Sequence, residues 1–436
     1  MNILILGSGG REHAFCRKAR QSDLCTALFI APGNAGTAQY GQNIPVGEND
    51  FDAIRKVCIE KKIGLVIVGP EEPLVKGIYD FFKNDRQLSH ITITGPSAEG
   101  ARLEGSKAFA KAFMQRHHIP SAHHREFDAA SYEEGLAYIK NHALPVVLKA
   151  DGLAGGKGVL ICNNHIEAMG EYELIIQKYK FGDAGKKVVV EEFLEGIELS
   201  VFVLTDGKDY LLLPEAKDYK KIGEGDKGLN TGGMGAISPV PFATESFMEK
   251  VTEKIIKPTI KGLRDEKIDY KGFIFFGLIK VGDEPMVIEY NCRMGDPETE
   301  VVFLRMENDL VSLLLAADKQ KLHSEKITID KKTAAAIVAV SKGYPLNYKK
   351  GLAIDFGYLN DPLVVKHMDE KGGVMVFHAA TRQEGENVVT NGGRVLAVAA
   401  LADSLPEAIE LSKEILAQIH FDGMYYRNDI GYEFIE

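Results

Sequence analysis

Four short apolar runs in the first hundred residues, each followed by a turn rich in Gly and Pro, most strongly constrain the fold of this chain. The runs lie at 3–6, 27–31, 65–68 and 91–94, and amphipathic stretches near 12–21, 51–62 and 74–84, which we expect to be helices, lie between them. Buried strands that alternate with helices indicate an open parallel sheet with helices on both faces. Ligands bind beyond the carboxyl ends of such strands, so we expect all four turns to border one crevice.

The pattern changes after residue 105, where we expect a small α+β unit inserted into a larger one. Residues 214–240 hold many Gly, Asp and Lys residues without a clear period, which indicates a long functional or disordered loop. The last hundred residues are β-rich with one helix at 406–420. Helices are also expected at 107–117, 132–141, 166–178 and 245–264, and strands at 145–150, 159–162, 188–192, 272–281 and 285–290. At roughly 100–200 residues per domain, the 436 residues suggest about three domains.

Charge and cysteine usage exclude several classes of function. The formal net charge of −10 gives a nucleic-acid partner no electrostatic support, although phosphorylated small molecules remain compatible with it. The chain has five cysteines, an odd number, and no two of them are in C-x-x-C spacing. This usage predicts reduced, buried thiols in a cytoplasmic protein and argues against a structural zinc site. No apolar stretch reaches membrane-spanning length, and the first residues do not resemble a signal peptide.

The first glycine-rich turn, G-S-G-G-R-E-H at 7–13, follows a strand and opens a helix, which suits an anion at the helix N-terminus. A dinucleotide fingerprint needs glycine where Glu12 stands and an acid near the end of the second strand, which reads I-A-P. NAD binding is therefore weakly supported. A monophosphate held by backbone N–H groups and Arg11 fits better, and a tight turn without a ligand stays an alternative.

The second glycine-rich turn, D-G-L-A-G-G-K-G at 151–158, lies between two strands. It is not a P-loop, because a P-loop needs glycine at 151 and Ser or Thr at 158. Glycine lets the backbone approach phosphates closely, and lysine supplies a mobile charge. Lys149, at the end of the preceding strand, could point at the same phosphates. A flexible surface hairpin is an equally good interpretation of this segment alone.

The segment V-I-E-Y-N-C-R-M-G-D-P-E at 287–298 is the most informative in the chain. Glu289 and Asn291 are two residues apart on a predicted strand and so share one face. Hard oxygen ligands on a rigid strand suit Mg²⁺, which substrate phosphates often complete. Arg293 follows, where it could stabilise a transferring phosphoryl group or a carboxylate. A strand end with polar groups in solvent is the alternative, which the very apolar strand makes less favourable.

A third segment, E-E-F-L at 191–194, ends another apolar strand, and Glu198 follows it. An adenine could stack by Phe193 and bond the strand-end backbone, while Glu198 could accept from ribose hydroxyls. Taken alone, an acidic strand end is more often a solvated rim.

Together these segments follow the order of a known family over nearly the whole chain. The matching stretches are G-S-G-G-R-E-H-A at 7–14, A-P-G-N-A-G-T at 31–37, V-G-P-E-E-P-L-V-K-G at 68–77, L-E-G-S-K-A-F at 103–109, K-A-D-G-L-A-G-G-K-G-V at 149–159, N-T-G-G-M-G-A at 230–236, N-C-R-M-G-D-P-E-T at 291–299 and V-T-N-G-G-R-V-L at 389–396. The chain thus resembles the phosphoribosylamine–glycine ligase family of the ATP-grasp superfamily.

The resemblance implies an α/β fold in three parts: an N-terminal open parallel sheet domain at 1–103, a central ATP-grasp fold of two α+β lobes at 104–328 with its small lobe at about 121–190, and a β-rich C-terminal domain at 329–436. It implies ATP-dependent ligation of glycine to 5-phosphoribosylamine through a glycyl phosphate, in purine biosynthesis. ATP and Mg²⁺ or Mn²⁺ are the implied cofactors. The implied partners are small molecules, with no nucleic acid or membrane, and a monomer is compatible with the sequence.

The resemblance also implies roles for individual residues. Arg293, Lys149 and Asp218 are the implied catalytic residues, and Glu289 and Asn291 the implied metal ligands. The implied ATP-binding residues are Lys107, Lys149, Gly155, Gly156, Lys157, Gly158, Glu191, Glu192, Phe193, Leu194 and Glu198. The implied substrate-binding residues are Gly9, Gly10, Arg11, Glu12, Asn34, Asp218 and Arg293.

The chain departs from the family pattern at a few positions. The family often reads Q-D-H-K-R where this chain has K-D-Y-K-K at 217–221, so Asp218 is kept while Lys217, Tyr219 and Lys221 depart from the pattern. Gly155 stands where alanine is common. Many ATP-grasp enzymes carry a metal carboxylate on the strand before the one that bears Glu289, and F-F-G-L at 275–278 offers none, which fits the glycine ligase branch.

Three other functions were weighed against this one. An NAD-dependent dehydrogenase is disfavoured by Glu12, and a non-catalytic nucleotide sensor by the retention of Glu289, Asn291 and Arg293. A third alternative keeps the ATP-grasp chemistry but changes the substrate, and the N-terminal turns discriminate between these cases.

Overall fold

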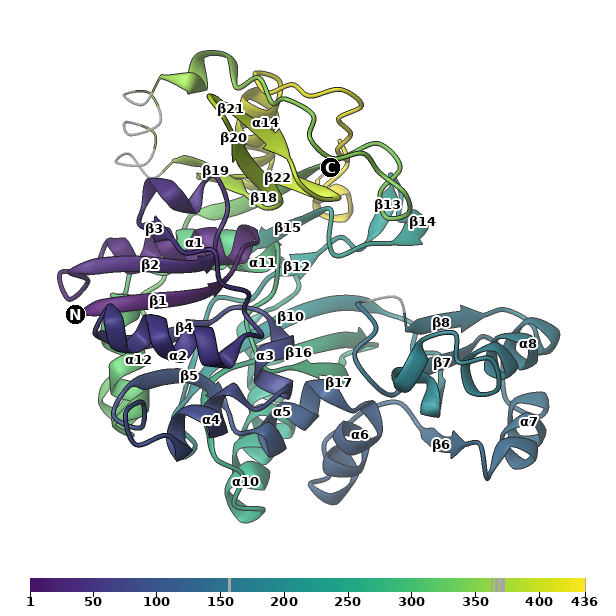
Figure 1. Ribbon diagram of the computed structural model, residues 1–436. Coiled ribbons are helices and arrows are strands. Elements are labelled where there is room, and N and C mark those ends of the chain that lie inside the picture. Colours follow the sequence, from purple (N-terminus) through teal and green to yellow (C-terminus); the bar gives the residue numbers. More distant parts are fainter. Residues whose placement is uncertain (156–157, 362–363, 365–367, 369–372, 436) are drawn as a thin grey trace.

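The structure is a computed structural model that describes residues 1–155, 158–361, 364, 368 and 373–435. Figure 1 shows three parts of the molecule: an N-terminal sheet continuous with a central sheet, a lobe that projects from the central sheet, and a C-terminal sheet above the N-terminal and central strands. The predicted fold class, α/β with a β-rich C-terminal region, is confirmed.

The N-terminal sheet is parallel, as the alternation of apolar runs predicts. Strands β1 (Asn2–Gly7), β2 (Ala27–Pro32), β4 (Ile63–Val68) and β5 (Thr92–Pro96) pair in parallel, and the short β3 (Gln42–Asn43) extends the edge. Their side chains are largely buried on both faces, because helices cover each side. The single helix expected near 74–84 is divided in two. Gly77 has a φ of +83°, a left-handed conformation that ends one helix and begins the next.

A nine-stranded sheet joins the N-terminal and central parts. Strand β16 (Tyr270–Val281) pairs antiparallel with the end of β5 and also with β10 (Ile197–Thr205) and β17 (Glu284–Asn291). The turns at the carboxyl ends of the N-terminal strands are therefore fixed relative to the β16–β17 hairpin.

The projecting lobe is a four-stranded sheet covered by two helices (Figure 1). Its strands run in the order β6 (His124–Asp128), β9 (Lys187–Glu192), β7 (Val146–Ala150) and β8 (Val159–Cys162). The helices α7 (Tyr132–Lys140) and α8 (His165–Ile176) pack together through the stacked rings of Tyr132 and Tyr172, whose centroids are 5.4 Å apart. The lobe thus has its own apolar core.

The C-terminal sheet recruits strands from a segment for which the sequence predicts a loop. Its order is β12 (Lys217–Asp218), β15 (Gly235–Ser238), β18 (Thr333–Val340), β22 (Arg394–Ala402) and β19 (Val374–His378). The expectation of an irregular 214–240 was wrong, because four strands of two to four residues form there. Strands this short show no periodicity, and β15 is held by β18, about a hundred residues further along the chain.

The other elements complete the layers. The helices are α1 (Gly10–Arg20), α2 (Phe51–Glu60), α3 (Glu71–Val75), α4 (Ile78–Asn84), α5 (Ala98–Gly105), α6 (Lys107–Arg116), α9 (Glu245–Val251), α10 (Lys257–Asp265), α11 (Glu298–Arg305), α12 (Leu310–Asp318) and α14 (Leu405–Leu416). The remaining strands are β11 (Tyr210–Leu212), β13 (Lys221–Gly223), β14 (Lys227–Asn230), β20 (Thr381–Glu384) and β21 (Asn387–Thr390). The π-helical turn Thr252–Ile256 joins α9 to α10, so the helix predicted at 245–264 is nearly continuous.

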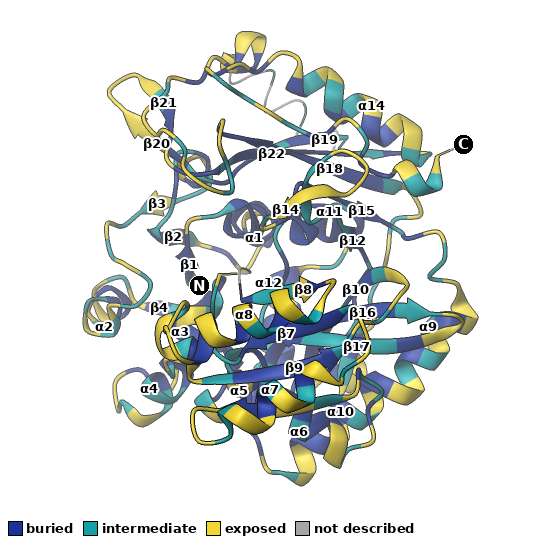
Figure 2. Cartoon of the chain, turned by 90° about the vertical axis from the view of Figure 1, so that its right-hand side faces the viewer, coloured by how far each residue is buried: buried dark blue, intermediate teal, exposed yellow. Residues whose placement is uncertain are grey.

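Figure 2 shows buried strands enclosed by helices whose outer faces are exposed. All five cysteines are free and buried, as predicted. Within the residues described, no helix has the length and apolar character needed to cross a membrane.

Candidate active site

The β16–β17 hairpin places Glu289 and Asn291 on one face, because they are alternate residues of one strand. Glu289 lies opposite Gly277, where a side chain would come within 3.1 Å of the Glu289 side chain, so glycine leaves room for the carboxylate. The strand register shifts beside Gly277 and leaves Ile288 without a partner. The carbonyl of Ile288 accepts a hydrogen bond of 3.2 Å from Lys149 Nζ, which brings β7 of the projecting lobe to the hairpin.

The electrostatics of the hairpin favour an ionised Glu289. Burial raises the pKa of Glu289, but the charges of Lys220, Lys149, Lys107 and Arg293 outweigh it and hold the pKa below its ordinary value. Within the described residues, this carboxylate forms no hydrogen bond or ion pair, and the Nδ2 atom of Asn291 is buried without a partner. A free carboxylate beside an amide oxygen suits a divalent cation completed by phosphate oxygens and water, and the amide nitrogen of Asn291 can donate to one of those phosphate oxygens. No group of three or more His, Cys, Asp or Glu in the described chain could hold a metal unaided.

Three lysines surround the base of the projecting lobe. Lys149, on β7, forms an ion pair of 2.9 Å with Glu191 Oε2, and Lys111, on α6, shares that oxygen at 3.3 Å. Burial lowers the pKa of Lys111 to about 8, although Glu191 partly offsets it. Burial likewise lowers the pKa of Lys107, whose ammonium donates to the carbonyl of Gly152 at 3.4 Å. Lys149 of the lobe and Lys107 of α6 both act on the charge of Glu289 in β17.

The glycine-rich turn that connects β7 to β8 is described in part. Gly155 has a φ of +56° and open space where a side chain would be, so the backbone here meets no neighbour. Gly156 and Lys157, both predicted to bind ATP, lie outside the described residues. Beyond the end of β9, the ring of Phe193 is 40% exposed, so a planar ligand could reach it.

Arg293 is held between two acidic side chains that the sequence analysis did not single out. Its Nη2 atom is 2.9 Å from Glu104 Oε1, and its Nε atom is 3.4 Å from Glu71 Oε2. Burial lowers the pKa of Arg293, but the two carboxylates outweigh burial, so the pKa lies above its ordinary value. The pKa of Glu104 rises to about 7, because burial outweighs the attraction of Arg293. The matching stretches at 68–77 and 103–109 contain both acids, so the signal was present.

Asp218, predicted to be catalytic and to bind substrate, lies in β12 near Lys220, which the sequence analysis did not single out. Lys220 Nζ contacts Glu198 Oε2 directly and is 4.0 Å from Asp218 Oδ1. Burial raises the pKa of Asp218, and Glu198 adds to this while Lys220 opposes it. The structure therefore brings Asp218 and Glu198, which the sequence places on separate segments, to one ammonium group.

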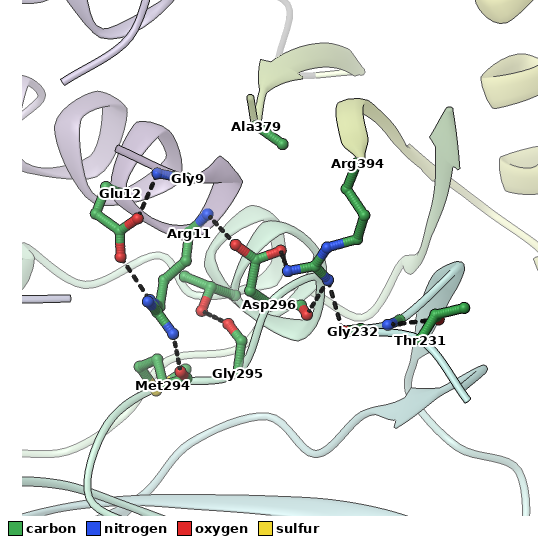
Figure 3. Close-up of polar contacts among 12 residues, drawn as sticks. Gly9, Arg11, Glu12, Thr231, Gly232, Met294, Gly295, Asp296, Ala379 and Arg394 are labelled. Atoms are coloured by element: carbon green, nitrogen blue, oxygen red, sulfur yellow. Dashed lines mark hydrogen bonds and ion pairs between the residues drawn. The ribbon is translucent and has the colours of Figure 1, made fainter. Parts of the chain in front are cut away.

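The helix N-terminus predicted to bind an anion already meets the protein's own carboxylates (Figure 3). The Gly9 amide donates to Glu12 Oε2 at 2.6 Å, and the Arg11 amide donates to Asp296 Oδ2 at 3.1 Å. The Arg11 side chain pairs with Glu12 at 2.6 Å and donates to the carbonyl of Met294. Arg394, from the C-terminal sheet, is 3.1 Å from Asp296 Oδ1. Arg11 and Glu12 thus hold the turn through their charged groups.

Two further predicted substrate residues lie next to this turn. Asn34 is buried, and its Nδ2 donates to the carbonyls of Ser8 and His378, each at 2.8 Å. Its Oδ1 accepts from the amide of Gly36 at 2.8 Å, so the side chain ties the first two turns to the C-terminal sheet. Gly10 is packed against Glu300, whose oxygen would lie 2.3 Å from a side-chain carbon at that position.

This arrangement defines the class of the protein. A small four-stranded lobe brings Lys149 to a hairpin that bears a carboxylate, as in ATP-grasp enzymes, and residues 105–299 match the family model described as phosphoribosylglycinamide synthetase, ATP-grasp (A) domain. Residues 1–104 and 334–433 match the N and C domains of the same synthetase.

Relatives over the whole length give the particular family. The chain is 44% identical to phosphoribosylamine–glycine ligase of Escherichia coli K12 over 441 residues, covering 100% of this chain and 99% of the relative. The enzyme of the same name from Chlorobaculum tepidum is 43% identical over 99% of both chains. The chain belongs to the phosphoribosylamine–glycine ligase family and is therefore an ATP-grasp ligase.

Solved structures agree with this assignment. A crystal structure of phosphoribosylamine–glycine ligase from Thermotoga maritima superposes with a TM-score of 0.84 at 32% identity, covering 98% of this chain and 100% of the other. A biotin carboxylase from Campylobacter jejuni superposes with a TM-score of 0.70 at 16% identity over 97% and 92% of the two chains, which shows the shared fold.

Proposed function

We propose that this protein joins glycine to 5-phosphoribosylamine at the expense of ATP, giving glycinamide ribonucleotide, ADP and phosphate in purine biosynthesis. Besides family membership, one observation carries the proposal. Glu289 and Asn291 lie on one face of β17, where neither the carboxylate nor the amide nitrogen has a hydrogen-bond partner among the described residues, and four cationic side chains act on Glu289. Such a set binds a metal–triphosphate complex rather than stabilising the free protein.

Glu289 and Asn291 are the residues that would hold Mg²⁺ or Mn²⁺, and the ion would supply charge neutralisation at the ATP phosphates. Lys107 and Lys149 are proposed to contact those phosphates, with the turn at 151–158 covering them. The strand-end residues Glu191 to Leu194 are proposed to hold adenine, and Glu198 the ribose. The Glu191 side chain would act indirectly here, since it pairs with Lys149 and Lys111.

The chemistry proceeds in two displacements. A carboxylate oxygen of glycine attacks the γ-phosphorus of ATP, the bond to the bridging oxygen breaks, and ADP leaves with the electron pair. The amine of phosphoribosylamine then attacks the acyl carbon, inorganic phosphate leaves, and the amine loses a proton. Lys149 and Arg293 stabilise the negative charge that develops on the phosphoryl group, and no side-chain nucleophile is needed.

The substrate side is proposed to lie at the N-terminal turns. Gly9, Gly10 and Asn34 would line it, while Arg11 and Glu12 keep the turn in place through the contacts described above. The proposed boundaries of the three domains are 1–103, 104–328 and 329–436. The enzyme is proposed to act in the cytoplasm, where its free cysteines stay reduced, and nothing in the reaction requires a second copy of the chain.

A coupled assay for ADP, with glycine and freshly prepared phosphoribosylamine, tests this proposal. We expect ADP release to require both substrates and a divalent cation, with one glycinamide ribonucleotide formed per ADP. Release with a different amine or amino acid, and none with this pair, would assign the chain to another ATP-grasp reaction. Nucleotide binding without any turnover would favour a sensor.

A further inference from the structure

We propose that Glu433, in the 3₁₀ turn Tyr432–Phe434, is a positioning residue for the ligation. It binds the two residues on either side of Asp218 and so fixes the direction in which the Asp218 carboxylate points. This inference rests on the proposed function, because it concerns the alignment of a residue that the resemblance implies in substrate binding and catalysis. Glu433 itself is not expected to touch a substrate.

Glu433 uses both of its carboxylate oxygens on β12 and the residue that follows it. Its Oε1 atom is 2.8 Å from Lys217 Nζ, and its Oε2 atom accepts a hydrogen bond of 2.8 Å from the Tyr219 hydroxyl. Lys217 Nζ also lies 3.9 Å from the centre of the Tyr219 ring. Hydrogen bonds to charged groups are among the stronger ones in proteins, so this arrangement, the Glu433 contact, holds both side chains in place.

The two partners of Glu433 lie on the opposite face of the chain from Asp218. Successive side chains of an extended strand alternate between its faces, so Lys217 and Tyr219 point one way and Asp218 the other. The strand itself is short. Asp218 pairs with β15, and the Tyr219 amide donates to the carbonyl of Gly235 at 3.0 Å. A twist of this short strand would redirect the Asp218 carboxylate, and Glu433 opposes that twist from the other face.

The turn that bears Glu433 is anchored to the same stretch of chain. Arg427 has a fully buried side chain, whose Nε and Nη2 atoms donate to Asp429 at 2.7 Å and 2.8 Å. Its Nη1 atom donates to the carbonyl of Lys221 at 3.1 Å. The amide of Tyr432 in turn donates to the carbonyl of Asp429 at 3.0 Å, which connects this arginine to the turn. The C-terminal segment thus holds the stretch at 217–221 at both of its ends.

Two of the departures from the family pattern are the residues that Glu433 binds. The pattern Q-D-H-K-R has glutamine where this chain has Lys217 and histidine where it has Tyr219. Glutamine carries no charge for an ion pair with Glu433, and histidine has no phenol hydroxyl to donate. The Glu433 contact therefore belongs to this chain and does not follow from the family pattern, although the Asp218 that it aligns is kept.

The test is a double-mutant cycle between Glu433 and Asp218, measured as kcat/KM for each substrate in the ADP assay. We expect Glu433→Ala to lower kcat/KM roughly 10-fold, because small displacements of a positioned group have effects of this order or larger. In an Asp218→Asn background, the same change should lower kcat/KM by less than about twofold, because the aligned carboxylate is already gone. Glu433→Gln keeps one acceptor oxygen, so its loss should be intermediate.

Further variants separate positioning from folding. Lys217→Met and Tyr219→Phe remove the two partners one at a time, and each should reproduce part of the loss seen in Glu433→Ala. Glu410→Ala is the matched control, because Glu410 lies on α14 of the C-terminal region with a side chain 65% exposed, and it should leave kcat/KM unchanged. Thermal midpoints of all variants fix an assay temperature at which each protein is folded. A purely structural role would move these midpoints without acting through Asp218.

Wild-type kcat/KM in Glu433→Ala, or an equal loss with and without the Asp218 carboxylate, would overturn the inference. If Glu433→Ala fails to fold, Glu433→Gln takes its place in the cycle under the same criteria. If Asp218→Asn has no turnover, Asp218→Glu, which keeps the charge but displaces it, serves as the background. Absence of ADP release by the wild type with glycine and phosphoribosylamine would instead overturn the proposed function.

Discussion

Two clusters of polar and charged residues lie at opposite ends of the turn at 291–296. They differ in whether their polar atoms have hydrogen-bond partners within the protein. The hairpin cluster comprises Lys107, Lys149, Glu289, Asn291 and Arg293. The junction cluster comprises Gly9, Arg11, Glu12, Asp296 and Arg394. In the hairpin cluster, the Glu289 carboxylate and Asn291 Nδ2 have no hydrogen-bond partner among the described residues, and Arg293 Nε has none either. In the junction cluster, both oxygens of Asp296 and of Glu12 are engaged.

The contrast separates groups kept for ligands from groups that hold the fold. Buried polar atoms without partners cost free energy, so a protein keeps them where a ligand will satisfy them. The junction cluster links the N-terminal sheet, the central part and the C-terminal sheet through Asp296, which accepts from Arg11 and pairs with Arg394 (Figure 3). One exception lies beside it: Glu300 is buried, its carboxylate oxygens have no hydrogen-bond partner among the described residues, and burial raises its pKa well above the ordinary value.

The largest effect is expected at the hairpin cluster. Glu289→Ala removes the only charged member of the proposed metal pair, so we expect kcat/KM for amide formation to fall on the order of a thousandfold. Stability should change little, because no bonded partner within the described residues is lost. The ADP assay and the thermal midpoint measure the two quantities, and isothermal titration with Mg²⁺ and ADP should show weaker metal binding.

Glu284→Ala is the matched control, since Glu284 lies on the same strand, is exposed, and pairs with Lys250 and Lys254. It should leave both turnover and metal binding unchanged. Wild-type turnover in Glu289→Ala would contradict the metal assignment and with it the contrast between the two clusters.

The second effect is expected at the junction cluster, and on stability. Asp296→Ala leaves the guanidinium of Arg394 without its carboxylate, and removing one partner of a largely buried pair costs about 4 kcal/mol. Urea denaturation should show this loss in the free energy of unfolding. Asp283→Ala is the control, because Asp283 is 89% exposed in its pair with Lys280 and should cost less than about 0.5 kcal/mol. Equal losses in both variants would mean that the junction cluster does not hold the domains together.

Much of the fold was predictable because its signals are local. The apolar runs predicted β1, β2, β4 and β5, and residues 159–162 predicted β8 with its observed bounds. The short strands within 214–240 were not predictable, because each gains its stability from distant partners such as β18. The break at Gly77 was missed for another reason, since the apolar pattern continues across it.

The site was predictable as a set of residue types but not as a set of contacts. The spacing of Glu289 and Asn291 gave their common face, which strand geometry fixes. The sequence could not show that Asp296 would take the amide of Arg11, because 285 positions separate them. Lys220 was missed although the family pattern Q-D-H-K-R also has a lysine at this position, because only the fold brings Glu198 and Asp218 beside it.

The smallest of the three effects concerns Glu104, which holds Arg293 at the edge of the hairpin cluster. Burial raises its pKa from an ordinary 4.5 to about 7, so the folded protein binds this proton more tightly than the unfolded chain. This contribution to stability is complete below about pH 4.5 and is lost as the pH rises through 7, amounting to about 3 kcal/mol. Glu104→Gln cannot titrate, so its stability should fall less over this range.

The measurement is the free energy of unfolding at several pH values between 4.5 and 7.5, compared between variant and wild type. Burial also raises the pKa of Glu298 to about 7. Because both proteins contain Glu298, its contribution cancels when the free energy of the variant is subtracted from that of the wild type at each pH. Glu99→Gln, on the same helix but with a side chain 54% exposed, should follow the wild-type curve. Parallel curves for Glu104→Gln and wild type would mean that Glu104 is ionised beside Arg293, and that Arg293 is then satisfied internally like the arginines of the junction cluster.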